Sequence, residues 1–270
     1  MDSLSHIVLG SAVGVAVMGR RTPLWKAALW GAVCGSLPDL DVLIDHGDPI
    51  RNITLHRSAT HALFYETLAA PVLAAIATGL QPGERPHWRL WWLTAWLALI
   101  THALLDSMTI YGTQLALPFS DHPYAFGSLF IIDPLFTLPM LAGMIAVLRW
   151  PGARARRCSA AALAVSVAYV LWSAGAQAYV RGIAADCARR RGLESAELLV
   201  TPTAFNTILW RIVVLTPNGY LEGFYSLLDA RRDVAFDAFP RDTTLYHRLE
   251  SDPRVARIAW FTQGFFTLRA

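Results

Sequence analysis

Charged side chains are scarce in this chain. Asp, Glu, Lys and Arg make up 16% of its 270 residues, against about 25% in a typical soluble domain. Hydrophobic residues make up 54%, and the mean hydropathy is positive. This composition argues against an ordinary soluble domain and predicts a membrane protein.

Other features are missing as well. Lys26 is the single lysine, the formal net charge is only +3, and no block of like charge suggests nucleic-acid binding. Cys34, Cys158 and Cys187 are far apart and odd in number, which excludes a metal knuckle or a disulfide framework. The start, MDSLSHIVLG, lacks the basic residues and cleavage site of a signal peptide, so we expect it to remain on the mature protein.

Apolar runs dominate the first two thirds of the sequence. Six are predicted as membrane segments: residues 4–19, 24–38, 61–80, 88–106, 129–148 and 159–180. A full crossing needs roughly 20 residues, so the first two are short and could dip into the bilayer without crossing it. We therefore predict a mainly α-helical, polytopic membrane domain of about six helices in residues 1–180.

Basic residues indicate how these segments are oriented. If the six segments alternate, nine basic residues fall on one side: Arg20, Arg21, Lys26, Arg85, Arg89, Arg149, Arg154, Arg156 and Arg157. The opposite loops, 39–60 and 107–128, contain only Arg51 and Arg57. The positive-inside rule then places the basic side in the cytoplasm and both termini outside.

Residues 181–270 have a different, more polar character. Asn218-Gly219 is a favoured two-residue turn, and it predicts two strands in TILWRIVVLTPNGYLEGFYSLLD. The stretch RIAWFTQGFFTLR predicts a further strand or pair of strands. We expect a small α+β domain here, outside the membrane and on its outer side.

The acids and histidines of residues 1–180 sort to the predicted outer side. The acids there are Asp2, Asp39, Asp41, Asp45, Asp48, Asp106, Asp121 and Asp133. The histidines there are His6, His46, His56, His61, His102 and His122. Glu84 and His87 lie on the inner side, and Glu66 lies within the third segment. Since only Arg and Lys defined the orientation, this sorting is partly independent support for a functional cluster.

Two pairs of these residues have helical spacing. Asp2 and His6, like His102 and Asp106, are four residues apart and would share a helix face. Each pair offers one imidazole and one carboxylate to the same ion, although Asp2 could simply cap the first helix.

Three further groups lie at segment ends. Pro38 is expected to end a helix, after which an extended stretch would point Asp39 and Asp41 the same way. His56 and His61 stand where the chain enters the third segment. All four could instead be solvated loop or interfacial residues. Asp133 precedes a proline at the start of the fifth segment.

The ligand types restrict the metal. Mixed imidazole and carboxylate ligands suit zinc, manganese or iron better than calcium, which prefers oxygen alone. About eight candidates exceed the three or four protein ligands of one catalytic zinc. This surplus favours two ions, or one ion whose ligands are held by many hydrogen-bonding partners.

Five stretches also resemble a known family: DSLSHIVLG, GSLPDLDVL, HRSATHALF, THALLDSMTIYGTQLALPFS and FIIDPLFT. In this order they are similar to bacterial inner-membrane metal-dependent hydrolases, also described as LexA-binding, inner-membrane-associated hydrolases. The likeness covers residues 1–140 closely, with Ser58 where the family more often has glycine, and TPTAFNTILWRIV resembles the longer members. The resemblance implies metal ligands at His6, Asp39, Asp41, His56, His61, His102 and Asp106, with Asp133 nearby.

Residues and resemblance together predict a multi-pass metallohydrolase of the bacterial inner membrane, with its site at the periplasmic membrane–water boundary. One or two divalent ions are expected, zinc first, with manganese or iron as alternatives. Arg57 could hold a phosphate oxygen or be a surface charge. Asp133 or Glu66 could act as general base or orient a ligand histidine, and Glu66 could instead hydrogen-bond a neighbouring helix.

The expected substrate is a phosphoester of a lipid or isoprenoid, with a lipid ester or amide nearly as suitable. No nucleic-acid partner is expected. The LexA label attaches to no residue here, because an outward-facing site would not meet a cytoplasmic repressor. Two other functions compete: a transporter of metal ions or small molecules, and a non-catalytic scaffold whose metal ties helix ends together.

Overall fold

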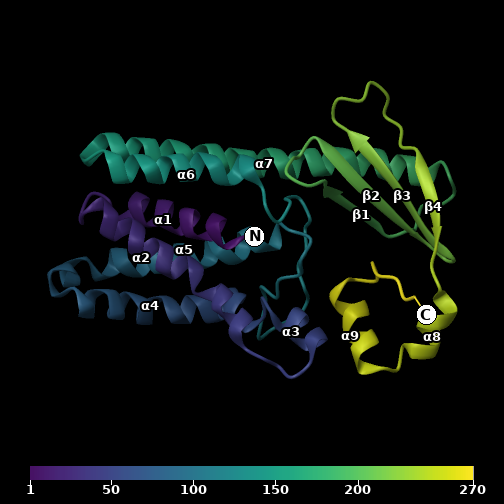
Figure 1. The fold of residues 1–270 in the computed structure, drawn as a ribbon, viewed down its shortest axis with the longest axis horizontal. Coiled ribbons are helices and arrows are strands. Elements are labelled where there is room, and N and C mark those ends of the chain that lie inside the picture. The colour runs from purple at the N-terminus through teal and green to yellow at the C-terminus, as the bar shows by residue number, and fades with distance from the viewer. Residues whose placement is uncertain (270) are drawn as a thin grey trace.

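The computed structural model describes residues 1–269, which form a helical bundle joined to a small β-sheet unit (Figure 1). The bundle contains α1 (Ser3–Met18), α2 (Leu24–Ser36), α4 (Leu63–Leu80), α5 (Trp88–Ser107), α6 (Pro134–Arg149) and the first part of α7 (Gly152–Arg189). The short elements between them are η1 (Pro38–Leu43), α3 (Pro49–Leu55), η2 (Ala59–His61) and η3 (Pro82–His87).

Small residues bring α1 and α2 into backbone contact. A Cβ atom built on Gly14 would lie 2.1 Å from the carbonyl oxygen of Ala27, and one on Gly10 would lie 2.2 Å from that of Gly31. Glycine stripes of this kind let two apolar helices approach closely, so that van der Waals contact holds them together. The core of the bundle includes Val8, Ala12, Val15, Trp91, Ala98 and Met140.

The number of membrane-spanning helices differs from the sequence prediction. Within residues 1–269, only α4 and α7 are long and apolar enough to cross a bilayer, so the prediction of about six membrane helices is wrong. α1 and α6 have 16 residues each, and α2 has 13. At 1.5 Å per residue these helices are about 20–24 Å long, short of the roughly 30 Å hydrocarbon core. α5 has 20 residues but includes His102, Asp106 and several tryptophans, which lower its hydropathy.

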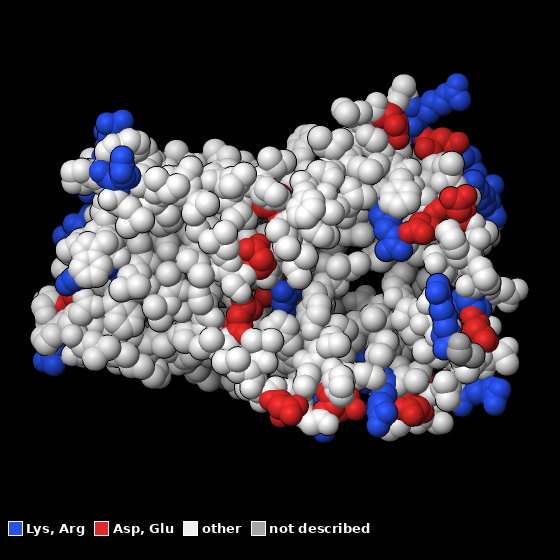
Figure 2. All heavy atoms as spheres, viewed as in Figure 1, with Lys and Arg blue, Asp and Glu red and all other residues white. Residues whose placement is uncertain are grey.

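The surface of the bundle is nevertheless apolar. Figure 2 shows an almost uncharged helical body, with Lys and Arg at the end away from the sheet unit and most other charges over that unit. Along α4, Leu68, Val72, Ile76 and Leu80 are all exposed. An exposed apolar row on a helix of spanning length is typical of a surface that faces lipid.

α7 links the two parts of the molecule without a break. Its 38 residues extend about 57 Å, well beyond a bilayer. The first half packs against α6, while Ala176, Val180 and Ala184 belong to the core of the sheet unit. The predicted domain boundary at residues 180 and 181 therefore falls inside one continuous helix.

The C-terminal unit is an antiparallel sheet in the order β1-β2-β3-β4. Its strands are β1 (Leu198–Pro202), β2 (Leu209–Thr216), β3 (Gly219–Ser226) and β4 (Phe236–Pro240). Thr216 pairs with Gly219 across the Asn218-Gly219 turn, which confirms the predicted hairpin. Alternate residues of β2, namely Trp210, Ile212 and Val214, are fully buried in the same core as α7.

Two helices, α8 (Thr243–Leu249) and α9 (Pro253–Phe261), follow the sheet. The strand predicted in RIAWFTQGFFTLR is wrong, because all of RIAWF belongs to α9. The sequence contained a helix signal, since Asp252 caps the helix by accepting a hydrogen bond from Arg254 N, and Pro253 occupies the first turn.

The close contact between α1 and α2 predicts that a glycine inside it tolerates an added methyl group less well than a glycine outside it. We expect Gly14→Ala to lower the free energy of unfolding by about 1–3 kcal/mol or more, because the new methyl group would meet a backbone carbonyl that cannot rotate away. Gly79→Ala on α4 is the matched control, since no atom of another element within residues 1–269 lies within 4 Å of its Cβ position. It should be neutral or stabilising. Thermal unfolding of both variants in detergent measures the difference, and equal melting temperatures would contradict it.

Candidate metal centre

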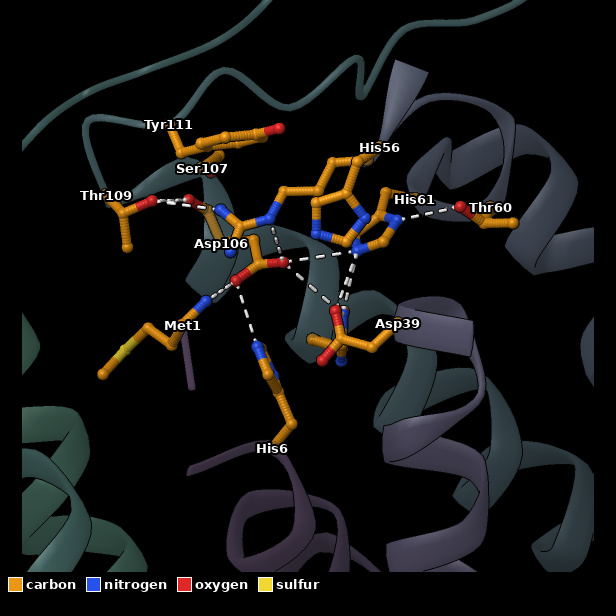
Figure 3. A network of polar contacts seen from close by, with 12 residues as sticks. Met1, His6, Asp39, His56, Thr60, His61, Asp106, Ser107, Thr109 and Tyr111 are labelled. Atoms are coloured by element: carbon orange, nitrogen blue, oxygen red, sulfur yellow. Dashed lines mark hydrogen bonds and ion pairs between the residues drawn. The ribbon is translucent and has the colours of Figure 1, made fainter. Parts of the chain in front are cut away.

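Four side chains from three segments meet at the end of the bundle that faces the sheet unit (Figure 3). η1 supplies Asp39, η2 supplies His61, and the last turns of α5 supply His102 and Asp106. The two α5 residues are four apart, and both point to the same place, as their spacing predicted. Three of the four side chains are almost fully buried, and Asp39 is 19% exposed.

The distances among these four side chains match a tetrahedral metal site. His61 Nε2 lies 3.0 Å from His102 Nε2, 3.7 Å from Asp39 Oδ1 and 3.3 Å from Asp106 Oδ2. His102 Nε2 lies 3.5 Å from each of the same two oxygens. Ligands bound tetrahedrally at 2.0–2.1 Å would be about 3.3 Å apart. These five separations among the four donor atoms are therefore of the right size for one ion between them.

Hydrogen bonds fix the proton positions on both imidazoles. His102 Nδ1 donates to the carbonyl oxygen of Gly35 at 2.7 Å. The Thr60 hydroxyl donates to Asp41 at 2.6 Å, so it accepts from His61 Nδ1, 3.0 Å away. Both Nε2 atoms consequently carry lone pairs, and they face each other at a separation where neither can donate. A cation between them is the partner that this arrangement fits.

The protonation states are those that metal binding requires. Burial lowers the pKa of His61 to about 4, so its imidazole is neutral near pH 7. A neutral imidazole and an ionised carboxylate bind a divalent ion without first losing a proton.

Arg57 lies beside Asp106 rather than on the surface. Its Nε is 3.1 Å from Asp106 Oδ2, one of its terminal nitrogens donates to Thr109 Oγ1 at 3.2 Å, and its guanidinium stacks over Tyr111 at 4.8 Å. The backbone of Arg57 has a φ of 64°, a left-handed conformation that costs a non-glycine residue of order 1–3 kcal/mol. The surrounding contacts therefore hold this arginine in place to partner the buried carboxylate.

His6 and the N-terminus approach Asp106 from the other side. His6 Nε2 donates to Asp106 Oδ1 at 3.0 Å, and the Met1 amino group contacts the same oxygen. The ring of His6 stacks on that of His102, with centroids 3.6 Å apart. One donor atom each from His6, Asp39, His102 and Asp106 can be chosen so that all lie within 4.8 Å of one another. His6 is thus close enough to be a ligand, although its bond to Asp106 makes it a partner of a ligand in this arrangement.

Asp41 and His56 form an outer layer. Asp41 accepts hydrogen bonds from His56 Nδ1 at 2.6 Å, from the Thr60 hydroxyl, and from the backbone N–H of Arg57 at 3.1 Å. Asp41 Oδ2 lies 3.6 Å from His61 Nδ1, on the side of the ring away from the facing Nε2 atoms. This carboxylate therefore orients His61 through Thr60, as carboxylates commonly do behind metal-binding histidines.

The local structure of PDLD explains why its two acids separate. We predicted an extended stretch with Asp39 and Asp41 on one side, but Pro38–Leu43 is a 3₁₀ helix, so that prediction is wrong. Proline is tolerated in the first turn because its missing N–H is not needed there. Residues two apart on a helix with three residues per turn point in different directions. Asp39 thus reaches His61 and His102, while Asp41 faces His56.

Glu66 and Asp133 lie outside the four-residue cluster. Glu66, in the first turn of α4, is 3% exposed, and neither of its carboxylate oxygens has a hydrogen-bond partner within residues 1–269. Asp133 caps α6 by accepting from Leu135 N at 3.0 Å, and it accepts from the Tyr169 hydroxyl of α7 at 2.8 Å. Asp2 caps α1 in the same way, by accepting a hydrogen bond from Ser5 N, so it has the capping role that its sequence position also suggested.

The C-terminal helices cover the loops beside the cluster. Phe261 of α9 packs edge-on against Tyr111, with ring centroids 5.3 Å apart, and Tyr111 in turn lies under Arg57. Gln263 donates to the carbonyl oxygen of Pro123, and Arg257 to the Thr54 hydroxyl. A line of contacts therefore connects the C-terminal segment to Asp106.

Thr60, Tyr111 and the Gly35 carbonyl also belong to this centre, and no sequence motif marks them. Thr60 stands beside His61 in HRSATH, but a hydroxyl next to a histidine is no signal by itself. The other two are brought in only by packing between helices that are distant in sequence.

The buried ion pair gives a prediction about stability. Arg57→Met should lower the free energy of unfolding by about 3–5 kcal/mol, because it leaves the Asp106 carboxylate buried without its guanidinium. Adding Asp106→Asn to Arg57→Met should recover part of this loss by removing the uncompensated charge. Chemical denaturation in detergent compares the three proteins, and a double variant less stable than Arg57→Met alone would contradict the pairing.

The partners of Asp133 give a second prediction. Tyr169→Phe should cost about 1.5–3 kcal/mol of stability, the range for a hydrogen bond to a charged group, while divalent-metal affinity stays unchanged. The control is Tyr65→Phe, which removes an exposed hydroxyl and should alter neither quantity. Calorimetric metal titration and thermal unfolding separate the two effects. A large loss of affinity in Tyr169→Phe would instead connect Asp133 to the metal centre.

Comparison with known proteins agrees with the family expected from the sequence motifs. The chain is similar to a protein of Bacillus subtilis (strain 168) named "Uncharacterized protein YfhP", with 25% identity over 274 residues, covering 97% of this chain and 80% of that protein. No solved structure matches the chain. Residues 1–180 match the family described as YdjM inner membrane protein. Since this region makes up two thirds of the chain, the protein belongs to the YdjM inner membrane protein family.

Proposed function

We propose that this inner membrane protein is a metal-dependent hydrolase acting on a lipid-like substrate, most suitably a phosphoester. The observation that carries the proposal is the pair of Nε2 lone pairs facing each other beside Asp39 and Asp106. Such a set of donors fits zinc, manganese or iron, and the small space between them fits one ion better than two. A divalent ion there would lower the pKa of a water molecule towards neutrality and polarise the bond to be cleaved.

The surrounding residues support this role in different ways. Asp41 and Thr60 hold His61 in the tautomer that presents Nε2, and Gly35 does the same for His102. Arg57 compensates the charge of Asp106. To bind a substrate phosphate as well, its guanidinium would have to divide its N–H donors between Asp106 and the phosphate. Asp39 is the one partly exposed member of the four, and it marks the side from which substrate would approach.

The two candidate spans support an outward-facing site. The first residues of α4 follow His61, and the last part of α7 lies in the sheet unit. The start of α4 and the end of α7 are therefore on the cluster side of the bundle. Arg85 and Arg89 follow α4, and Arg154, Arg156 and Arg157 lie at the start of α7. The positive-inside rule then favours a cytoplasmic location for these basic ends and a periplasmic one for the cluster and sheet unit.

A metal-stabilised scaffold is the second candidate, and one observation favours it. Four protein donors complete the tetrahedral sphere of zinc and would leave no position for water. Catalysis on zinc would require one carboxylate to move away, and Asp39 is the most exposed of the four. A six-coordinate manganese or iron ion would keep open positions without any movement.

Metal content and hydrolysis test the proposal together. Purified protein in lipid nanodiscs should hold about one equivalent of divalent metal, and His102→Ala combined with Asp106→Ala should lose it, because two of four donors are removed. His122→Ala, in an exposed loop, is the control and should keep the metal.

The loaded protein should release phosphate from dodecyl phosphate, and the double variant should not. Metal without turnover of dodecyl phosphate or of matched lipid esters would favour the scaffold, and absence of metal would refute the proposed centre.

A further inference from the structure

A surface pocket of about 230 Å³ adjoins the candidate metal centre but contains none of its four donors. It lies between the end of α2, the first turns of α4, and α5. Its lining includes Pro38, which precedes Asp39, and Thr60, which precedes His61. The pocket is therefore one residue away from the cluster at two points along the chain.

The lining is mainly apolar, with hydroxyl groups from Thr60 and Tyr65. Glu66 is the only acid in it, and the apolar residues include Leu37, Ala69, Leu73 and Leu99. Glu66 is only 3% exposed, and both oxygens of its carboxyl group are without a hydrogen-bond partner in the described part of the chain. An unpartnered buried carboxyl is costly, and it is relieved by a ligand that supplies a hydrogen bond.

The position of the pocket indicates how such a ligand would enter. α4 is one of the two helices of spanning length, and its exposed row begins with Leu68, next to the pocket residue Ala69. A ligand from the bilayer would therefore slide in sideways with its chain against leucines. Its polar end would meet Glu66, and it would be close to the partly exposed Asp39.

We propose that this pocket binds the alkyl-alcohol part of an amphiphile, with the Glu66 carboxyl hydrogen-bonded to the alcohol oxygen's proton. An alcohol fits better than an anionic head, for which the lining offers no basic side chain, and better than a bare hydrocarbon, which would leave the carboxyl unpartnered. The identification of this alcohol as the product of the reaction rests on the proposed function, because an alkyl phosphoester and water give an alcohol and phosphate; the binding itself does not.

Photolabelling in nanodiscs tests the pocket directly. The probe is a long-chain primary alcohol with a diazirine in its chain, mapped by peptide mass spectrometry. We expect labels on the first turns of α4 and around Leu99. 1-Dodecanol should compete for this labelling, whereas dodecane and dodecanoate should not. Labelling spread evenly over the lipid-facing helices, or equal competition by dodecane, would overturn the proposal.

Variants on α4 separate the pocket from the bilayer surface. Ala69→Phe places a ring in the pocket and should reduce labelling about tenfold, equivalent to about 1.4 kcal/mol of binding. Ala75→Phe adds the same ring at another exposed position of α4, outside the pocket lining, and should leave labelling unchanged. Glu66→Leu should abolish the preference for dodecanol over dodecane, while Glu66→Gln, which still hydrogen-bonds, should keep it. An unchanged preference in Glu66→Leu would exclude the role of Glu66.

Metal analysis of the same samples keeps the two proposals apart. Ala69→Phe should lose the label but retain the metal, because it removes no donor. Wild-type protein that takes the label but holds no metal would refute the proposed hydrolase and leave the alcohol pocket standing. Protein that holds metal but shows no labelling that 1-dodecanol competes for would refute the alcohol pocket and leave the proposed metal centre standing. The competition measured on wild type needs no variant, so misfolding of a variant would not remove the test.

Discussion

The approach of two neutral imidazoles governs the structure at this end of the bundle. His61 and His102 present lone pairs to each other at 3.0 Å in a buried space, with carboxylate oxygens of Asp39 and Asp106 beside them. Four electron-pair donors without a proton among them repel one another unless positive charge is supplied. Arg57 and the Met1 amino group both lie against Asp106, so they do not occupy the space between the imidazoles. A bound cation is the simplest physical reason for a chain to hold these atoms together.

Helix packing far from the cluster fixes its geometry. The glycine contacts between α1 and α2 end at Gly35, where an added Cβ would lie 3.0 Å from the His6 carbonyl oxygen. The carbonyl oxygen of Gly35 accepts a hydrogen bond from His102 Nδ1, and so determines that Nε2 of His102 faces the cluster. His6, one helix away, stacks on His102. The close contact between α1 and α2 thus positions the Gly35 carbonyl, and that carbonyl sets the tautomer of His102. A looser pair of helices would not fix which His102 nitrogen faces the cluster.

Some of this arrangement follows from sequence and some does not. The four-residue spacing of His102 and Asp106 is local, and helix geometry alone places both on one face. The Asn218-Gly219 hairpin is local in the same sense. By contrast, the division of Asp39 and Asp41 between two layers depends on a 3₁₀ turn that proline permits but does not require. Whether Asp133 and Asp2 serve as caps or ligands is decided by the hydroxyl or amide that packing brings to them, as Tyr169 and Ser5 show.

The overestimate of membrane spans has a physical cause that also bears on the site. Hydropathy records that a segment is apolar, but α1, α2 and α6 are apolar partly because they bury one another, and their lengths fall short of a bilayer. Asp39 lies just past the end of the short α2, next to the pocket that contains Glu66, whereas His102 and Asp106 lie in the last turns of the 20-residue α5. Polar donors and an apolar pocket thus adjoin at the end of the short α2, and the long α7 joins the bundle to the sheet unit.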